Sequence, residues 1–300
     1  MDVVTGALGY TGKYITRGLL AQGGRVRTLT GHLDRPNPFG DRVDVAPLSF
    51  DDPAALVESL RGAATLYNTY WVRFSHGALT FERAVENTRT LFRAAKQAGV
   101  RRVVHVSIAN PSEDSLLPYY RGKALLERDL IESGLSYAML RPTVIFGDED
   151  ILINNIAWLL RRFPVFGVPG AGDYTIQPIF VEDMADLAVS LGARRDDVIV
   201  DAVGPEVYTF DTLVRLIARA VGSRARIVHV PPGLGLFLAQ VIGRLLGDVT
   251  LTREELDGLM ASLLVSSGPP TGRTLLSEWL AQHAETVGVR YASEVQRHYR

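Results

Sequence analysis

The stretch Val3-Val4-Thr5-Gly6-Ala7-Leu8-Gly9-Tyr10-Thr11-Gly12 decides how the N-terminal part of the chain folds. Two β-branched residues lead into three glycines, and apolar residues at helical spacing follow over Lys13–Gln22. The pattern predicts a strand, a tight turn and a helix whose N-terminal N–H groups point at a phosphate. Gly6 permits the turn, Gly9 lets a pyrophosphate approach the backbone, and Gly12 lets helix and strand pack closely. The alternative is a turn of the same shape that binds nothing.

The composition sets limits on the fold and on the partners. The 300 residues, 47% hydrophobic, suffice for one large α/β domain or for one domain with a smaller appended region. The net charge is −1 and no basic patch interleaves with aromatic residues, so we expect no nucleic-acid partner. No apolar run is long enough to span a bilayer. Asp2 precedes the first strand directly, so we expect no signal peptide.

Cysteine is absent from the chain. Its absence excludes disulfides, thiol catalysis and thiolate metal sites, and we expect no metal centre. A chain without disulfides is compatible with the cytoplasm, which is the location that we expect.

A second strand over residues 25–30 ends in a loop that holds His32 and Arg35. An acidic residue at this place would bind the ribose 2′-hydroxyl of NAD, whereas these two residues could pair with the 2′-phosphate of NADP. We therefore expect NADP, with NAD as the alternative. Arg35 can also be read as an ordinary solvated loop residue.

Strands and helices alternate through the first half of the chain. Further strands are expected at residues 43–48, 64–67, 102–107 and 137–140, and helices at 53–62, 79–98 and 119–133. Asp51 or Asp52 can cap the helix that opens at Pro53. The alternation predicts a doubly wound parallel sheet with right-handed crossovers.

The second half of the chain is less regular. We expect a dinucleotide-binding domain over residues 1–150 and a smaller, mostly helical substrate region over 151–300, with later strands near 174–203 free to rejoin the first sheet. The expected helices are 150–162, 182–191 and 210–221, and everything from Pro231 onward is expected to be helical. The expected strands are 174–180, 198–203 and 225–230, and 163–173 is expected to be a loop. Thr252 and Glu255 have the spacing of a capping box.

Three residues carry the candidate chemistry. Tyr119 and Lys123 lie four apart on one helix, so both side chains leave the same face. An ammonium beside a phenol favours the phenolate, which suits a tyrosine acting as general acid or base. Ser107 ends the fifth strand, at the sheet edge where ligands bind, and could orient the reacting oxygen. The alternative is a surface Tyr–Lys pair without chemistry.

These features together resemble the short-chain dehydrogenase/reductase superfamily. The glycine turn, Asn68, Ser107, Tyr119-x-x-x-Lys123 and Arg141-Pro142-Thr143 match its motifs, and Gln177–Ala185 resembles its extended and atypical branches, which include NmrA-like NADP sensors and the accessory subunit of respiratory complex I. The resemblance implies a Rossmann fold with Tyr119 as the proton donor or acceptor, supported by Lys123, and with Ser107 orienting the substrate oxygen. The cofactor contacts that it implies are Gly6, Leu8, Gly9, Tyr10, Thr11, Gly12, His32, Arg35, Asp51, Asn68, Lys123, Pro142 and Thr143.

Two departures from the family pattern concern the ligands. Ser49 and Phe50 stand where the family often has an aspartate for the adenine, and Asp51 follows. Residues 174–177 lack the basic residue that sugar-nucleotide members use for the second phosphate, which argues against a nucleotide-sugar substrate.

We expect an NAD(P)-dependent oxidoreductase that acts on a small carbonyl or alcohol. One alternative is a regulator or accessory subunit that holds NADP without turning it over, and another is an epimerase or dehydratase that forms a transient ketone. The apolar stretch 234–246 could be a buried helix, line a substrate cavity, form a homodimer face or lie on a membrane surface.

Several further side chains have two readings each. His105 lies within an expected strand, which favours a satisfied core histidine over a ligand. The remaining candidates either line the substrate pocket or only fill packing space: Tyr67, Tyr70, Trp71, Phe74, Asn154, Asn155 and Trp158.

Overall fold

The computed structural model describes residues 1–75, 77 and 79–295. Contacts divide the chain into two compact units. The first unit consists of Met1–Pro142 and Val181–Ala202, and the second consists of Thr143–Phe180 and Val203–Arg300. The chain therefore leaves the first unit after residue 142 and returns to it for one helix and one strand.

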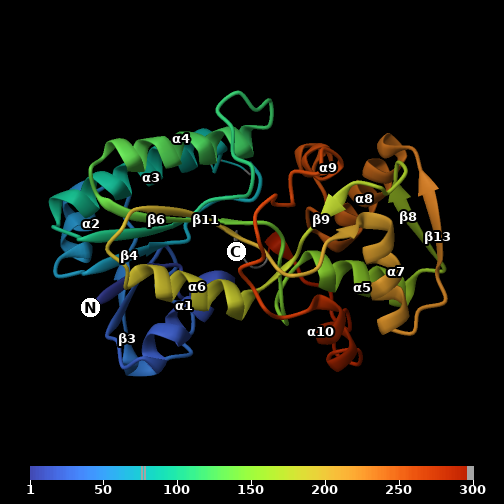
Figure 1. Cartoon of the computed structure of the whole chain (residues 1–300), viewed down its shortest axis with the longest axis horizontal. Coiled ribbons are helices and arrows are strands. Elements are labelled where there is room, and N and C mark those ends of the chain that lie inside the picture. Colours follow the sequence, from blue (N-terminus) through green and yellow to red (C-terminus); the bar gives the residue numbers. More distant parts are fainter. Residues whose placement is uncertain (76, 78, 296–300) are drawn as a thin grey trace. The chain divides into compact units, whose positions relative to one another are not determined.

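The first unit is built on a seven-stranded sheet in the order β11-β6-β5-β4-β1-β2-β3 (Figure 1). Every neighbouring pair is parallel. The strands are β1 (Asp2–Thr5), β2 (Val26–Thr30), β3 (Val43–Pro47), β4 (Thr65–Asn68), β5 (Arg102–Val106), β6 (Ser136–Pro142) and β11 (Val198–Ala202). The doubly wound parallel sheet expected from the sequence is confirmed.

Helices cover both faces of this sheet, with α2, α3 and α4 on one face and α1 and α6 on the other (Figure 1). They are α1 (Tyr10–Ala21), α2 (Pro53–Leu60), α3 (Phe81–Gln97), α4 (Pro118–Glu132) and α6 (Val181–Gly192), with a short 3-10 turn η1 (Gly40–Arg42). Of the two expected caps of α2, Asp52 is the one used, because its Oδ1 accepts the N–H of Ala55 at 3.0 Å. Thr80 caps α3 in the same way, through the N–H of Arg83 at 3.2 Å.

Apolar side chains fill the space between the sheet and the α2–α4 layer. Val3, Leu66 and Val103 come from adjacent strands and are fully buried, and Leu91 and Leu126 from the covering helices pack into the same cluster. Burial of this kind contributes about 1.5 to 3 kcal/mol for each large side chain, so the cluster holds the covering helices firmly on the sheet.

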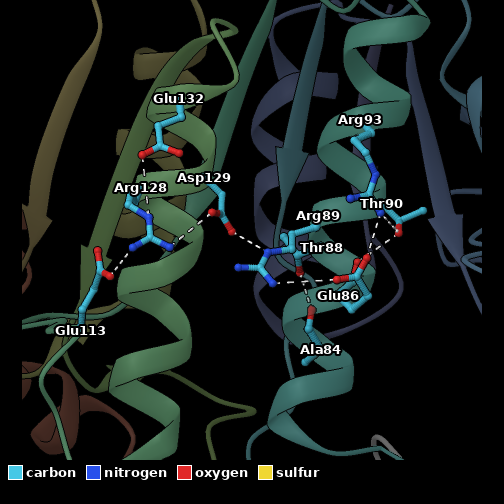
Figure 2. Close-up of polar contacts among 10 residues, drawn as sticks. All are labelled: Ala84, Glu86, Thr88, Arg89, Thr90, Arg93, Glu113, Arg128, Asp129 and Glu132. Atoms are coloured by element: carbon cyan, nitrogen blue, oxygen red, sulfur yellow. Dashed lines mark hydrogen bonds and ion pairs between the residues drawn. The ribbon is translucent and has the colours of Figure 1, made fainter.

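On their outer surface, helices α3 and α4 are also joined by the ion pair of Arg89 and Asp129 (Figure 2). Arg89 of α3 donates from Nε to Oδ2 of Asp129 in α4 at 2.7 Å, and Arg128 reaches Glu113 and Asp129. Exposed pairs of this kind contribute little individually. The position of α4 therefore depends chiefly on the apolar cluster beneath it.

The second unit holds five helices and six short strands in its described residues. They are α5 (Leu152–Arg162), α7 (Phe210–Ala220), α8 (Pro232–Leu246), α9 (Arg253–Met260) and α10 (Leu276–Gln282), with β7 (Ile145–Phe146), β8 (Val165–Pro169), β9 (Thr175–Ile176), β10 (Ile179–Phe180), β12 (Tyr208–Thr209) and β13 (Arg226–Val230). The strands form three two-stranded sheets, β10-β7, β12-β9 and β13-β8. The predicted capping box of α9 is confirmed, with the side chains of Thr252 and Glu255 bonding each other's backbone N–H groups.

Two sequence expectations about this region are wrong. Residues 163–173 were expected to be a loop, but they contain β8, which pairs in parallel with β13. Helical structure was expected throughout after Pro231, but nonhelical segments separate the three helices there. Of the later strands, β11 lies in the central sheet, whereas β9 pairs with β12.

Helix α8 exposes much of its apolar surface. Phe237 is 56% exposed and Leu245 is 82% exposed, and Leu234 and Leu238 are exposed as well. The buried-helix reading of residues 234–246 is therefore wrong. Among the described residues, no helix is both long and apolar enough to cross a membrane.

Candidate cofactor and active site

The glycine turn has the shape that its sequence predicts. Gly6 adopts a φ of +68°, and the N–H of Gly9 donates to the carbonyl oxygen of Gly6 at 2.8 Å. A Cβ atom on Gly12 would lie 2.3 Å from that same oxygen, so only glycine fits there. Helix α1 begins at Tyr10, three residues earlier than the sequence indicates, because the turn leads directly into it.

The first turn of α1 carries no side-chain cap, and no acidic residue lies in it. Backbone N–H groups at a helix N-terminus then face outward with the positive end of the helix dipole behind them. The N–H of Ala7 donates to Oγ1 of Thr28 at 3.1 Å, which fixes the turn to β2. This cradle, which consists of the glycine turn and the uncapped first turn of α1, fits the diphosphate of a dinucleotide.

The loop after β2 starts beside the turn, because the N–H of Gly6 donates to the carbonyl oxygen of Leu29 at 2.9 Å. Thr30 accepts the N–H of His32 on its Oγ1 at 3.0 Å and so shapes the beginning of the loop. His32 is exposed and Arg35 is partly buried. Both residues therefore lie at the carboxyl end of β2, where a ribose 2′-substituent would be read.

A groove of about 750 Å³ opens between the loop after β3 and the start of α3. It is lined by Leu48, Ser49, Phe50, Asp51, Asp52, Leu79, Arg83 and Asn87. The predicted adenine ligand, Asp51, is 91% exposed and pairs with Arg83 at 2.5 Å. The Phe50 ring lies 4.7 Å from that of Tyr70, whose hydroxyl accepts a hydrogen bond from Asn87 at 2.8 Å.

A buried polar network joins the carboxyl ends of β1, β4 and β5. Oδ1 of Asn68 accepts from Oγ1 of Thr5 and from the N–H of Tyr70, both at 3.1 Å, and its amide nitrogen lies 3.0 Å from Nδ1 of His105. The two bonds to the oxygen orient the amide so that its nitrogen donates to the imidazole. Asn68 is fully buried, so we interpret it as a residue that holds the strand ends together.

His105 is a neutral core residue. Burial, together with the nearby Lys123, lowers the pKa of its imidazole well below the ordinary value. Because Nδ1 accepts from Asn68, the proton lies on Nε2, and that buried atom has no hydrogen-bond partner among the described residues. The burial of His105 agrees with the prediction that it is a core residue, although only one of its two ring nitrogens makes a hydrogen bond among the described residues.

Lys123 is buried, with 2% of its surface exposed. Its Nζ donates to the carbonyl oxygen of Val106 at 2.7 Å and lies 4.4 Å from the centre of the Trp71 ring. Burial lowers the pKa of this ammonium to about 7, and the Glu127 carboxylate opposes the shift. The bond to Val106 ties α4 to the end of β5, directly before Ser107.

Tyr119 lies one helical turn before Lys123, in a cluster of aromatic rings. The centre of its ring lies 5.6 Å from that of Trp71 and 5.9 Å from that of Phe81, and its plane is nearly perpendicular to both. Ser107 is 3% exposed, and its Oγ has no hydrogen-bond partner among the described residues. Such an unused buried hydroxyl favours a ligand atom as its partner.

The sequence did not predict the roles of two side chains near this site, Glu127 and Trp71. Glu127 is buried and accepts Nε of Arg141 on its Oε1 at 3.0 Å, with a second bond from the same guanidinium at 2.5 Å. Its signal was the i, i+4 spacing from Lys123 on α4. Trp71 was noted only as a pocket or packing residue, and nothing in the sequence pairs it with Lys123.

Other predicted residues lie elsewhere. The hydroxyl of Tyr67 packs against Gly192 of α6, where an added Cβ would lie 1.9 Å from it, so this ring is on the opposite face of the sheet from His105 and α3. Pro142 ends β6 and accepts the N–H of Ala109 at 2.9 Å. Thr143 begins the second unit, where its hydroxyl donates to the carbonyl oxygen of Gln177.

The candidate substrate residues of α5 have packing roles. Asn154 bonds to Asp150 and accepts the N–H of Gly288, and Asn155 bonds to the backbone of Ala292 in both directions. The Trp158 ring packs on the ring of Tyr291 at 5.3 Å. All three therefore tie α5 to the C-terminal segment.

Residues 6–154 match a family described as NAD(P)H-binding. The N-terminal half of the chain belongs to this family. Its first unit is thus an NAD(P)H-binding domain, and the turn at Gly6–Gly12 lies within the matched region.

Similar proteins include a mitochondrial NADH dehydrogenase subunit and a ceramide reductase. The chain is 29% identical over 259 residues to NADH dehydrogenase [ubiquinone] 1 alpha subcomplex subunit 9 of Mus musculus, which covers 81% of this chain and 66% of the relative. It is 25% identical to the Arabidopsis thaliana subunit over 76% of this chain and 60% of that protein. The chain therefore spans less than two thirds of these relatives. The ceramide reductase of Caulobacter vibrioides is 27% identical over 77% of this chain and 74% of its own.

Solved structures share the fold. Triphenylmethane reductase of Citrobacter sp., complexed with NADP(H), has a TM-score of 0.76 at 17% identity and covers 95% of this chain and 100% of its own. An NADPH-dependent quinone oxidoreductase of Escherichia coli has a TM-score of 0.75 at 21% identity, and the match covers 94% of this chain and 99% of that protein.

Proposed function

We propose that the protein is an NAD(P)H-dependent oxidoreductase that reduces a carbonyl group, an enone or a quinone in an apolar substrate. The bond from Lys123 Nζ to the Val106 carbonyl carries the proposal, because it brings the Tyr119–Lys123 pair of α4 against the strand end that holds Ser107. When bound, the cofactor supplies the hydride. Tyr119 then gives its hydroxyl proton to the substrate oxygen, and Ser107 Oγ donates a hydrogen bond that holds that oxygen.

The cofactor's place follows from the two features of the first unit described above. The diphosphate would lie on the cradle of Gly6, Gly9 and Gly12, and the adenine in the groove beside Phe50 and Arg83. We propose NADP over NAD because His32 and Arg35 follow β2 without an acidic residue between the strand end and His32.

The apolar substrate class rests on the rings around the reacting pair. Tyr70, Trp71 and Tyr119 are each partly exposed, and flat apolar groups pack well against such rings. Relatives named ceramide reductase and sterol demethylase protein B, and structural neighbours named for quinones and triphenylmethane, support a hydrophobic substrate.

The test is reduction of a panel of apolar ketones, enones and quinones, followed as NADPH oxidation. Replacing Tyr119 by Phe should lower kcat/KM at least about 100-fold, the usual contribution of a general acid, while the Kd for NADPH stays within a few-fold. The matched control is Tyr120→Phe, since Tyr120 is the next residue of the same helix. If Tyr119→Phe and the control lose activity equally, the proton role of Tyr119 is wrong.

One observation favours a second function, a protein that holds NADP(H) without turnover. The exposed apolar residues of α8 give the second unit a surface for a partner or membrane, and the mitochondrial relatives are named as subunits of a larger complex. This alternative predicts tight NADPH binding and no oxidation with any member of the panel. Substrate conversion without net NADPH oxidation would instead indicate an epimerase or dehydratase that uses the same tyrosine.

A further inference from the structure

Trp71 contacts both residues of the reacting pair. The Lys123 Nζ is 4.4 Å from the centre of its ring, and the Tyr119 ring meets it at 5.6 Å with the planes near perpendicular, at 79°. The loop after β4 brings Trp71 to α4, and Trp71 is not among the residues that carry the family resemblance. One indole thus contacts both members of the pair.

Packing alone positions this indole. Its Nε1 is buried and has no hydrogen-bond partner among the described residues. Phe81 stacks on it at 6.2 Å with an interplanar angle of 23°. Helix α4 lets the ring approach through Gly122, where a Cβ atom would lie 2.9 Å from Cη2 of Trp71. The glycine before Lys123 therefore makes room for the ring.

We propose that Trp71 is a positioning residue whose indole face holds the Lys123 side chain as a cation against the Val106 carbonyl. A ring face within about 6 Å of an ammonium attracts it, and the attraction is strongest where water is excluded, as it is around Lys123. The importance of this contact for turnover rests on the proposed function, but the contact itself does not.

The other groups around Lys123 would not hold the cation by themselves. Glu127 favours the charged form from one turn along α4, but Arg141 already binds both of its carboxylate oxygens. His105 faces the ammonium from β5 and is neutral. Burial therefore destabilises the charged form of Lys123, and the Trp71 ring face and the Val106 carbonyl oxygen stabilise it.

The sequence allows a direct measurement, because its only lysines are Lys13, Lys96 and Lys123. Lysine labelled with ¹³C at Cε gives three NMR signals whose shifts titrate with pH, and Lys13→Arg and Lys96→Arg variants assign them. In Trp71→Leu the pKa of Lys123 should fall by about one unit, the size of a buried cation–π contact. Trp71→Phe keeps an aromatic face, so in this variant the pKa of Lys123 should fall by less than half as much.

Two further variants separate the ring contact from general packing. Phe81→Leu removes another ring that packs on Trp71. In this variant the pKa of Lys123 should stay within about 0.3 unit of its value in the wild type. Gly122→Ala keeps both Trp71 and Lys123 but drives the ring away, so the pKa should fall as in Trp71→Leu. Gly122→Ala also tests the proposal if Trp71→Leu fails to fold.

The direction of the shift decides the outcome. An unchanged pKa in both Trp71→Leu and Gly122→Ala would overturn the proposal, and so would a rise, because the ring would then only be excluding water. A fall in a protein that turns over no substrate would support the Trp71 contact and count against the proposed function. In an active protein, the limb of the kcat/KM profile that reports Lys123 should move by the same amount as the NMR pKa.

Discussion

Gly12 in the cofactor turn and Gly122 in α4 both lie where a helix meets a close neighbour, but the neighbours differ. A Cβ atom on Gly12 would lie 2.3 Å from a backbone oxygen, whereas one on Gly122 would lie 2.9 Å from the edge of a side-chain ring. Backbone in a hydrogen-bonded turn cannot move without losing the turn, but a ring can rotate away. The cofactor cradle is therefore rigid and local, and the reacting pair depends on side chains from separate segments.

The largest effect is expected from Gly12→Ala. The new methyl group cannot avoid the Gly6 carbonyl, so the turn must open, and the Kd for NADPH should rise about 100-fold or more, or about 2.7 kcal/mol. Calorimetric titration measures the loss. The control is Gly18→Ala in the same helix, where a Cβ atom would be 3.2 Å from a methyl group of Val189 and binding should change little. If Gly12→Ala and Gly18→Ala bind NADPH equally well, the cofactor turn is not the rigid site that sets Gly12 apart from Gly122.

An intermediate effect is expected from the pH dependence that Lys123 gives to stability. Its folded pKa of about 7 lies below its ordinary value, so the unfolded chain binds more protons across the interval between the two. The free energy of unfolding should therefore rise with pH, by about 2 kcal/mol between pH 7 and pH 9 from this group alone. Urea unfolding of the wild type and of Lys123→Met at both pH values isolates the contribution. An identical pH dependence in the two proteins would contradict the burial of a titrating ammonium.

The smallest effect is expected from Arg89→Ala, which removes the bond between α3 and α4 drawn in Figure 2. The loss should be at most about 0.5 kcal/mol, because the arginine is partly exposed and apolar packing holds α4. Arg93→Ala is the control, since Arg93 pairs with Glu86 on its own helix. A loss of more than about 1 kcal/mol, measured by urea unfolding, would show that surface charge holds α4 and with it the reacting pair.

The sequence predicted those parts of the molecule whose cause is local. The turn at Gly6 and the cap at Asp52 each depend on residues within a few positions, and so does the capping box at Thr252. The sheet followed from alternating strands and helices, because parallel strands need crossovers.

The remainder depends on contacts between distant residues. β8 contains glycine and proline and is stabilised as a strand by pairing with β13, some sixty residues later. Likewise, the bond between Asn68 and His105 and the contact between Trp71 and Lys123 join residues that only the sheet and α4 bring together. Spacing along the chain does not encode such pairs. The Tyr119–Lys123 motif could therefore be predicted from the sequence, but the residues that contact it could not.

The return of the chain to its first unit has a consequence during synthesis. β11 pairs with β6, so the edge of β6 has no neighbour until roughly sixty further residues have emerged from the ribosome, about 3 to 12 s later. Limited proteolysis of nascent chains stalled before and after residue 202 would reveal whether this edge is open in that interval. An uncovered strand edge invites pairing with another chain, so newly made protein should be most prone to aggregate, and most in need of a chaperone, before β11 is synthesised.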